Sequence, residues 1–148
     1  MLVKRAMSKN VVSVSVPGNR EKVLDLMRKE DKAVLPVVKG DTKQLVGLIT
    51  RSDLIVNPDE EQIAILMSTD LVTASPDDDV KDVAKKMIDN NVRRVPVVDD
   101  NGDLVGIITS FDLVSNALIK LESDDPVENF MITTVPTTWY KTPLNVAF

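Results

Sequence analysis

The stretch LVGLITRSDL at residues 45–54 returns as LVGIITSFDL at residues 104–113, and seven of the ten positions are identical. Upstream of it, residues 7–38 align with residues 67–98 without a gap, so that each Pro-Val-Val segment falls on the other. Such self-similarity at a fixed spacing indicates a structural repeat. The chain therefore contains two copies of one unit, with a period of about 60 residues.

The repeats divide the chain into three expected parts. We expect a first repeat over residues 1–60 and a second over residues 61–122. Ser123-Asp124-Asp125-Pro126 is a break typical of a linker, and residues 123–148 are expected to be the start of a third repeat that is cut short. Without a second apolar hairpin and a closing helix, this last part cannot form a core of its own.

Each repeat is predicted to run strand, helix, strand, strand, helix, which gives an α+β fold of two βαββα units. Apolar residues at helical spacing predict amphipathic helices over Asn19–Glu30 and Val80–Asn90. Gly-containing turns between apolar runs predict one antiparallel hairpin per repeat. The expected strands are Val11–Val16, Leu35–Val38 and Leu45–Thr50 in the first repeat, and Leu71–Ala74, Val95–Val98 and Leu104–Thr109 in the second.

Composition argues against several classes of function. The 148 residues contain no Cys and no His, which removes thiol nucleophiles, imidazole bases and soft-metal ligands together. We therefore expect no enzyme activity. The net charge of −5 and the 3% aromatic content argue against broad nucleic-acid binding. No secretory signal and no membrane-length apolar run is present, so a cytoplasmic location is expected.

The strongest candidate motif is Thr-x-x-Asp, at Thr50–Asp53 and again at Thr109–Asp112. A Thr that begins a helix, with an acid three residues later, is typical of a helix cap. The same geometry suits a nucleotide, because a helix N-terminus offers free N–H groups to phosphate and a carboxylate accepts both ribose hydroxyls. Gly47 and Gly106, three residues earlier, would let backbone or ligand approach closely.

These paired Pro-Val-Val strands and Leu-Val-Gly-x-Ile-Thr-x-x-Asp segments resemble the CBS domains, named after cystathionine beta-synthase. The resemblance covers about residues 2–122. It implies that the two repeats pair through their sheets into a Bateman-type module with ligand clefts between them. The arrangement of the repeats is also similar to archaeal proteins with four CBS repeats that are related to the gamma subunit of AMP-activated kinase.

The resemblance implies specific roles for the residues of two clefts. Asp53 and Asp112 would hold ribose hydroxyls, and Thr50 and Thr109 would contact phosphate or ribose. Neighbouring strand residues would wrap the adenine, and Ser52 matches the family's hydroxyl beside the aspartate. The strand residues are Leu48 and Ile107.

Repeat two departs from this pattern at two places. Phe111 replaces the hydroxyl residue, which puts the polar part of that cleft in doubt. Arg93 and Arg94 match positions from which basic side chains of the kinase subunit reach phosphate in the partner repeat's cleft. Two adjacent arginines are otherwise typical of a solvated strand edge. We therefore expect the Asp53 cleft, served by both arginines, to be the better site and the Asp112 cleft to be weaker or empty.

The expected function is that of a regulatory sensor that binds AMP, ADP or ATP as a ligand. S-adenosylmethionine is the alternative ligand, since the aspartate–ribose contact serves any adenosine. A scaffold for oligomerisation with empty clefts, and a module that regulates an attached enzyme, as in IMP dehydrogenase, are further alternatives. The expected partners are a second CBS pair in a homodimer or further CBS repeats of a longer chain, with no membrane.

Asp77-Asp78-Asp79 allows two interpretations. Clustered carboxylates suit a hard cation such as Mg²⁺. Three acidic residues directly before Val80 are also typical of an ordinary helix start, because they face the positive end of the helix dipole. We expect a helix start here and no metal site.

Overall fold

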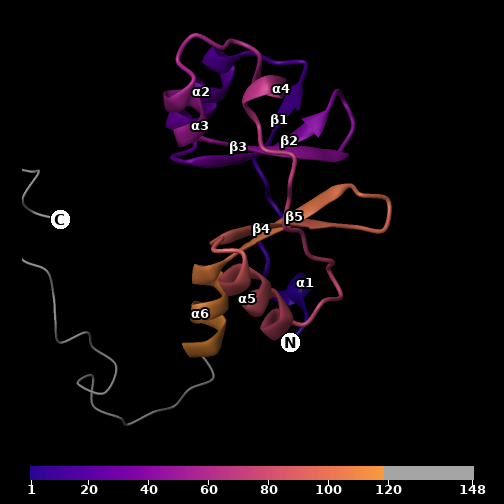
Figure 1. Cartoon of the computed structure of the whole chain (residues 1–148). Coiled ribbons are helices and arrows are strands. Elements are labelled where there is room, and N and C mark those ends of the chain that lie inside the picture. The colour runs from indigo at the N-terminus through magenta and orange to yellow at the C-terminus, as the bar shows by residue number, and fades with distance from the viewer. Residues whose placement is uncertain (119–148) are drawn as a thin grey trace, which may run out of the picture.

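The computed structural model describes residues 1–118 and confirms the mixed α+β architecture (Figure 1). The expected third repeat at residues 123–148 lies outside the described residues. The elements in chain order are α1 (Val3–Ala6), β1 (Val14–Val16), α2 (Arg20–Lys29), β2 (Val34–Lys39), β3 (Leu45–Thr50), α3 (Arg51–Val56), α4 (Ile63–Leu66), α5 (Val80–Asp89), β4 (Arg94–Val98), β5 (Leu104–Thr109) and α6 (Ser110–Leu118).

The predicted hairpins form in both repeats. β2 pairs antiparallel with β3, and β4 pairs antiparallel with β5, each with a register shift at the second valine of its Pro-Val-Val segment. The turn residues Gly40 and Gly102 have φ values of 52° and 80°. Glycine adopts this left-handed region without the steric cost that a side chain would add, which is why these loops contain it.

The first strand of each repeat is shorter than predicted. β1 covers only Val14–Val16, where it pairs in parallel with β2. In repeat two no strand forms over Leu71–Ala74, and Ala74 alone bridges to Val97. The backbone leaves the sheet directly after Ala74, because the carbonyls of Pro76 and Asp78 accept hydrogen bonds from backbone N–H groups of α1. Apolar periodicity therefore overestimated the length of both strands.

The segment that opens each repeat, called its linker here, packs in the other repeat. The short helix α1 opens repeat one in the sequence, yet Val3 is fully buried in the core of repeat two. The helix α4 opens repeat two, and its residues Ile63 and Leu66 are buried in the core of repeat one. Each core thus includes the segment that precedes the other repeat's first strand, so the packing units do not coincide with the sequence repeats.

The linker methionines Met7 and Met67 occupy the space beside the glycines that recur in the two repeats. A Cβ on Gly106 would lie 2.4 Å from Sδ of Met7, and one on Gly47 would lie 2.5 Å from Sδ of Met67. We expected these glycines to admit backbone or a ligand, but a methionine side chain takes the place in both repeats. Both methionines pack against the core that their linker joins.

The two sheets face each other, and the longer helices lie on their outer sides (Figure 1). The hairpin ends are hydrogen bonded across the pair: Leu104 N–H donates to the Lys43 carbonyl at 2.8 Å, and Leu45 N–H donates to the Gly102 carbonyl at 3.1 Å. The linkers add to this, since Ser8 exchanges backbone bonds with Ile107 at 2.9 and 3.0 Å. The facing sheets therefore place the β5–α6 junction of one repeat opposite the β2 end of the other.

Across residues 1–118, every helix is too short or too polar to span a bilayer.

Candidate ligand-binding cleft between the repeats

The two Thr-x-x-Asp motifs form the same capping box in both repeats. Thr50 Oγ1 accepts from the Asp53 N–H at 3.1 Å, while Asp53 Oδ2 accepts from the backbone N–H and hydroxyl of Thr50 at 2.7 and 2.8 Å. In repeat two the corresponding distances between Thr109 and Asp112 are 3.2, 2.8 and 2.7 Å. The capping interpretation is confirmed. The bonds to threonine use one oxygen of each carboxylate, which leaves Oδ1 outside the box.

A cleft of about 290 Å³ lies against the second box and draws on both repeats. Thr109, Asp112 and Ile107 form one wall. The opposite wall comes from the β2 end of repeat one and from the linker segment that crosses beside β5; its residues are Lys32, Val34, Leu35, Pro36, Ser8, Asn10, Val11 and Val12. The cleft thus combines a carboxylate at a helix N-terminus with an apolar interior.

The two arginines lie in different places. Arg94 begins β4, pairs in register with Thr109, and lines the Asp112 cleft. Arg93 precedes the strand and lines a separate hollow formed by α5 and α6. The hypothesis that both arginines serve the Asp53 cleft therefore differs from the structure, because successive residues at a strand end face opposite sides.

Repeat one has a valine at the position of Arg94. Val34 is the repeat-one counterpart of Arg94, since it pairs with Thr50 in the same register. Val34 lines the Asp112 cleft from across the repeat boundary, whereas Arg94 lines that cleft from within its own repeat.

The remaining residues favour the Asp112 cleft for an anion. In the gapless alignment Lys32 corresponds to Val92, and Asn10 corresponds to Asp70. The Asp112 cleft therefore has a second cation and a neutral amide from repeat one, and the aligned positions of repeat two have a valine and an acid. Sequence analysis did not identify Lys32 or Asn10. The alignment of the repeats does show that these two positions differ. The difference points to a site only once it is known that residues of repeat one line the cleft of repeat two.

Phe111 does not occupy the Asp112 cleft. Its side chain is 76% exposed, and it is not among the residues that line the cleft. Ser52, its counterpart, is also exposed. Leu48 is half-buried and exchanges backbone bonds with Ser68, as Ile107 does with Ser8. The position of the Phe111 side chain therefore gives no reason to expect a less polar Asp112 cleft.

The acidic run before α5 is engaged in local bonds. Asp79 caps the helix by accepting from the Lys81 N–H at 2.9 Å, and Asp77 pairs with Lys4 at 2.6 Å. The Ser75 N–H, and next the Lys86 ammonium, lower the pKa of Asp78 despite an opposing effect of partial burial. The Lys81 N–H and the N-terminal ammonium lower the pKa of Asp79. No cluster of three metal-ligating side chains occurs within residues 1–118.

Comparison with known proteins identifies the family. The model of the CBS domain matches residues 3–59 and again residues 61–119. The CBS domain-containing protein YhcV of Bacillus subtilis is 30% identical over 133 residues, which cover 86% of this chain and 93% of YhcV. An inosine-5'-monophosphate dehydrogenase of Nitrosopumilus maritimus is 35% identical over 120 residues, covering 77% of this chain but 24% of that enzyme. The chain spans 44% of an uncharacterized Methanocaldococcus jannaschii relative, MJ0188, to which it is 30% identical over 80% of its own length.

Solved structures agree with this assignment. The CBS domain pair of protein MJ0100, in complex with 5'-methylthioadenosine and S-adenosyl-L-methionine, is 32% identical with a TM-score of 0.73, covering 82% of this chain and 98% of that one. CBSX2 in complex with AMP is 25% identical with a TM-score of 0.73, covering 81% and 98%. Protein MJ1225 from Methanocaldococcus jannaschii, proposed to be an archaeal homologue of the AMP-activated kinase gamma subunit, shares the fold with a TM-score of 0.80 at 21% identity, covering 99% and 61%.

The family model matches both repeats, and solved CBS domain pairs share the fold of the chain. The chain therefore belongs to the CBS domain family, as a pair of CBS repeats.

Proposed function

We propose that this chain is a regulatory module that binds an adenine nucleotide in the cleft lined by Thr109 and Asp112. One observation carries the proposal. The cleft brings a carboxylate with an oxygen outside its capping bonds together with two cations from different repeats, Lys32 and Arg94. A ribose phosphate needs an acceptor for its diol and positive charge for its phosphate, and this cleft offers both.

The chemistry of the cleft suggests how the parts of a nucleotide are divided. Asp112 Oδ1 accepts from the ribose hydroxyls, while Oδ2 continues to hold the helix cap. Lys32 and Arg94 contact the phosphate, with help from the positive end of the α6 dipole. The apolar surface of Pro36, together with Val12 and Ile107, packs against the adenine ring. Because both repeats contribute, binding would change how the two sheets are held together.

The charge of the cleft favours a phosphate over S-adenosylmethionine. The MJ0100 pair is solved with S-adenosyl-L-methionine and 5'-methylthioadenosine, and CBSX2 with AMP, so related pairs accept adenosines with different substituents. The sulfonium of S-adenosylmethionine is positive and is repelled by two nearby cations, whereas phosphate is attracted by them. S-adenosylmethionine remains the alternative ligand, since its carboxylate can bind one of the cations.

We propose the Asp53 side as a second, weaker site. There Thr50 and Asp53 repeat the box geometry, Leu48 and Ser52 occupy the aligned positions, and Arg94 is the one cation expected from across the boundary. Asp70, the counterpart of Asn10, would repel a phosphate. This reverses the order of the two sites that the sequence predicted.

The test is calorimetric titration of AMP, ATP, adenosine and S-adenosylmethionine into the purified chain. We expect AMP or ATP to bind more tightly than adenosine, and Asp112→Asn to weaken that binding by about 10-fold or more, the equivalent of one charge-assisted hydrogen bond. The matched variant Asp53→Asn changes the same cap in the other repeat and should weaken it less.

Lys32→Val, which copies the residue of repeat two, separates the phosphate contribution from that of the ribose. It should reduce the affinity for AMP and leave the affinity for adenosine unchanged. If none of the four ligands gives heat with the folded protein, the nucleotide-binding proposal is wrong and the scaffold alternative takes its place.

We also propose that the module self-associates through α5 and α6. The apolar side chains Ile88, Phe111 and Val114 are 79%, 76% and 54% exposed on these helices. Ile88 and Val114 line a hollow of about 470 Å³ between them. Exposed apolar patches of this kind mark interaction surfaces. Light scattering coupled to size-exclusion chromatography should give a dimer mass for the chain and a monomer mass for Ile88→Lys; a monomer for the unaltered chain would contradict the proposal.

A further inference from the structure

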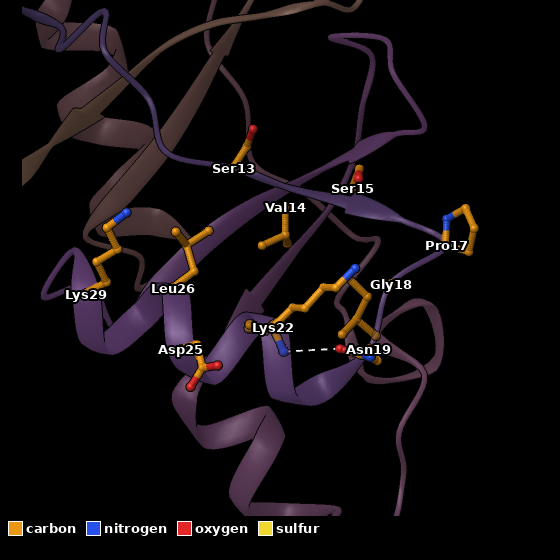
Figure 2. Close-up of a pocket in the computed structure, with 12 residues that line it drawn as sticks. Ser13, Val14, Ser15, Pro17, Gly18, Asn19, Lys22, Asp25, Leu26 and Lys29 are labelled. Atoms are coloured by element: carbon orange, nitrogen blue, oxygen red, sulfur yellow. Dashed lines mark hydrogen bonds between the residues drawn. The ribbon is translucent and has the colours of Figure 1, made fainter.

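A second hollow lies outside the cleft between the repeats, on the outer side of repeat one. It has a volume of about 430 Å³ and is formed between the edge strand β1 and the helix α2 (Figure 2). Its apolar floor consists of Val14, Val23, Leu26 and Ile63. This volume is within the range of about 300–1,000 Å³ that small-molecule sites occupy.

Positive charge borders this hollow at both ends. Lys22, Leu26 and Lys29 occupy positions i, i+4 and i+7 of α2, which fall on one face of a helix. Figure 2 shows all three side chains directed from α2 toward β1, with Leu26 beside Val14. The two lysines are about 10 Å apart along the helix axis, at 1.5 Å per residue. An apolar surface therefore lies between two cations.

One acidic residue, Asp25, also lines the hollow. Its side chain points away from β1 in Figure 2, and its carboxylate is paired with Arg28 at 3.6 Å. Within residues 1–118, neither Lys22 nor Lys29 takes part in an ion pair. The hollow is therefore complementary to a negative group, although an exposed pair of this kind contributes modestly to affinity.

The corresponding surface of repeat two differs in its side chains. Lys86 takes the place of Leu26, and its ammonium donates to Asp78 Oδ2 at 3.2 Å and to the Thr73 carbonyl at 3.4 Å. It thus spans the space that is open in repeat one. The counterparts of Lys22 and Lys29 are Asp82 and Asp89. The two repeats therefore differ here: the lysines that border the hollow in repeat one are aspartates in repeat two, and Lys85 stands where repeat one has Asp25.

We propose that the hollow between β1 and α2 binds a small organic anion with an apolar body, of the kind represented by a medium-chain carboxylate. The carboxylate contacts Lys22 or Lys29, and the hydrocarbon covers Leu26 and Val14. This site is separate from the cleft that contains Asp112, so the two sites bind different ligands and can be occupied together.

The experiment is a titration of the whole chain with octanoate, followed in two-dimensional ¹H–¹⁵N spectra. We expect saturable shifts of the backbone amides in residues 13–29 and none in the aligned residues 73–89. AMP at saturating concentration should not displace octanoate, which distinguishes this site from the nucleotide cleft. Octylamine, which has the same chain length and the opposite charge, should give no saturable shifts in residues 13–29.

Variants separate the charge from the apolar contact. Lys22→Gln and Lys29→Gln should each weaken octanoate binding by about 2- to 5-fold, as expected for exposed charge pairs. Leu26→Gln should weaken it by about 10-fold without changing the net charge. Lys85→Gln, which removes an exposed lysine from α5, should leave it unchanged. Equal shifts in both repeats, displacement by AMP, or unaltered affinity in both Leu26→Gln and Lys29→Gln would overturn the proposal.

Discussion

Replacing Gly106 by alanine tests the crossing of the first linker into repeat two. The new Cβ would lie 2.4 Å from Met7 Sδ, 3.1 Å from its Cγ and 3.2 Å from its Cε. Ordinary carbon contacts are about 3.5–4.0 Å, so the methionine side chain must move by about 1 Å or more. The backbone beside it cannot follow easily, because Ser8 is held to Ile107 by two hydrogen bonds.

The expected cost follows from two opposing terms. Overpacking of a well-packed site costs about 1–3 kcal/mol. Removing a glycine from a strand restricts the unfolded chain and returns about 0.5–1 kcal/mol. Gly106→Ala should therefore lower the free energy of unfolding by about 1–2 kcal/mol, a change that urea unfolding followed by circular dichroism resolves.

The cause is isolated by a double-mutant cycle. In a Met7→Ala background the three atoms nearest the new Cβ are gone, so Gly106→Ala should cost much less. The matched pair Gly47 and Met67 should be rescued only in part, since a Cβ there also lies 3.1 Å from the Ser68 carbonyl. An equal cost of Gly106→Ala with and without Met7 would refute the packing argument.

Three further outcomes are expected. Thr109→Ala should lower the free energy of unfolding by about 1 kcal/mol, because the α6 cap with Asp112 is lost; an unchanged urea midpoint would contradict this. The pKa of Asp78 is lowered by the Ser75 N–H and by Lys86, so its contribution to stability is present above about pH 4 and is lost as the pH falls through the lower folded value. Urea unfolding between pH 7 and pH 2.5 should accordingly show a smaller acid-side loss for Asp78→Asn, and equal losses would show that the carboxylate contributes nothing. Gly102→Ala should cost about 1 kcal/mol in thermal or urea unfolding because its φ is +80° and the surrounding space is open, so that backbone strain alone acts; no loss of stability would contradict that reasoning.

The sequence predicted the helices and strands correctly where both ends of the element are marked by nearby residues. β3 and β5 begin and end where the Leu-Val-Gly segments predicted, because a strand bounded by a glycine turn and a capping threonine has both ends marked in the sequence. The starts of α2 and α5, which are capped by Asn19 and Asp79, could be predicted for the same reason. The first strands were overestimated, because their extent depends on the partner strand and on the linker that pulls the chain away.

The candidate site was predictable in part. Repetition of Thr-x-x-Asp identified Thr109 and Asp112 without any knowledge of the partner surface, since a capping box lies within four residues. The placement of Arg94 and the contribution of Lys32 depend on which residues face each other across the repeats. The spacing of apolar residues does not contain that information, because it shows which face of a helix or strand is buried but not which element packs against that face.

The sequence by itself determined that this chain is a pair of CBS repeats, with a capped helix after each central hairpin and no cysteine or histidine for catalysis. Tertiary structure alone decided that α1 packs in repeat two and α4 in repeat one, and that Lys32 of repeat one lines the cleft at Asp112. The physical reason is the range of the interactions. Caps, turns and amphipathic faces are set by residues a few positions apart, whereas the clefts are formed by residues about 80 positions apart that meet only when the two sheets face each other.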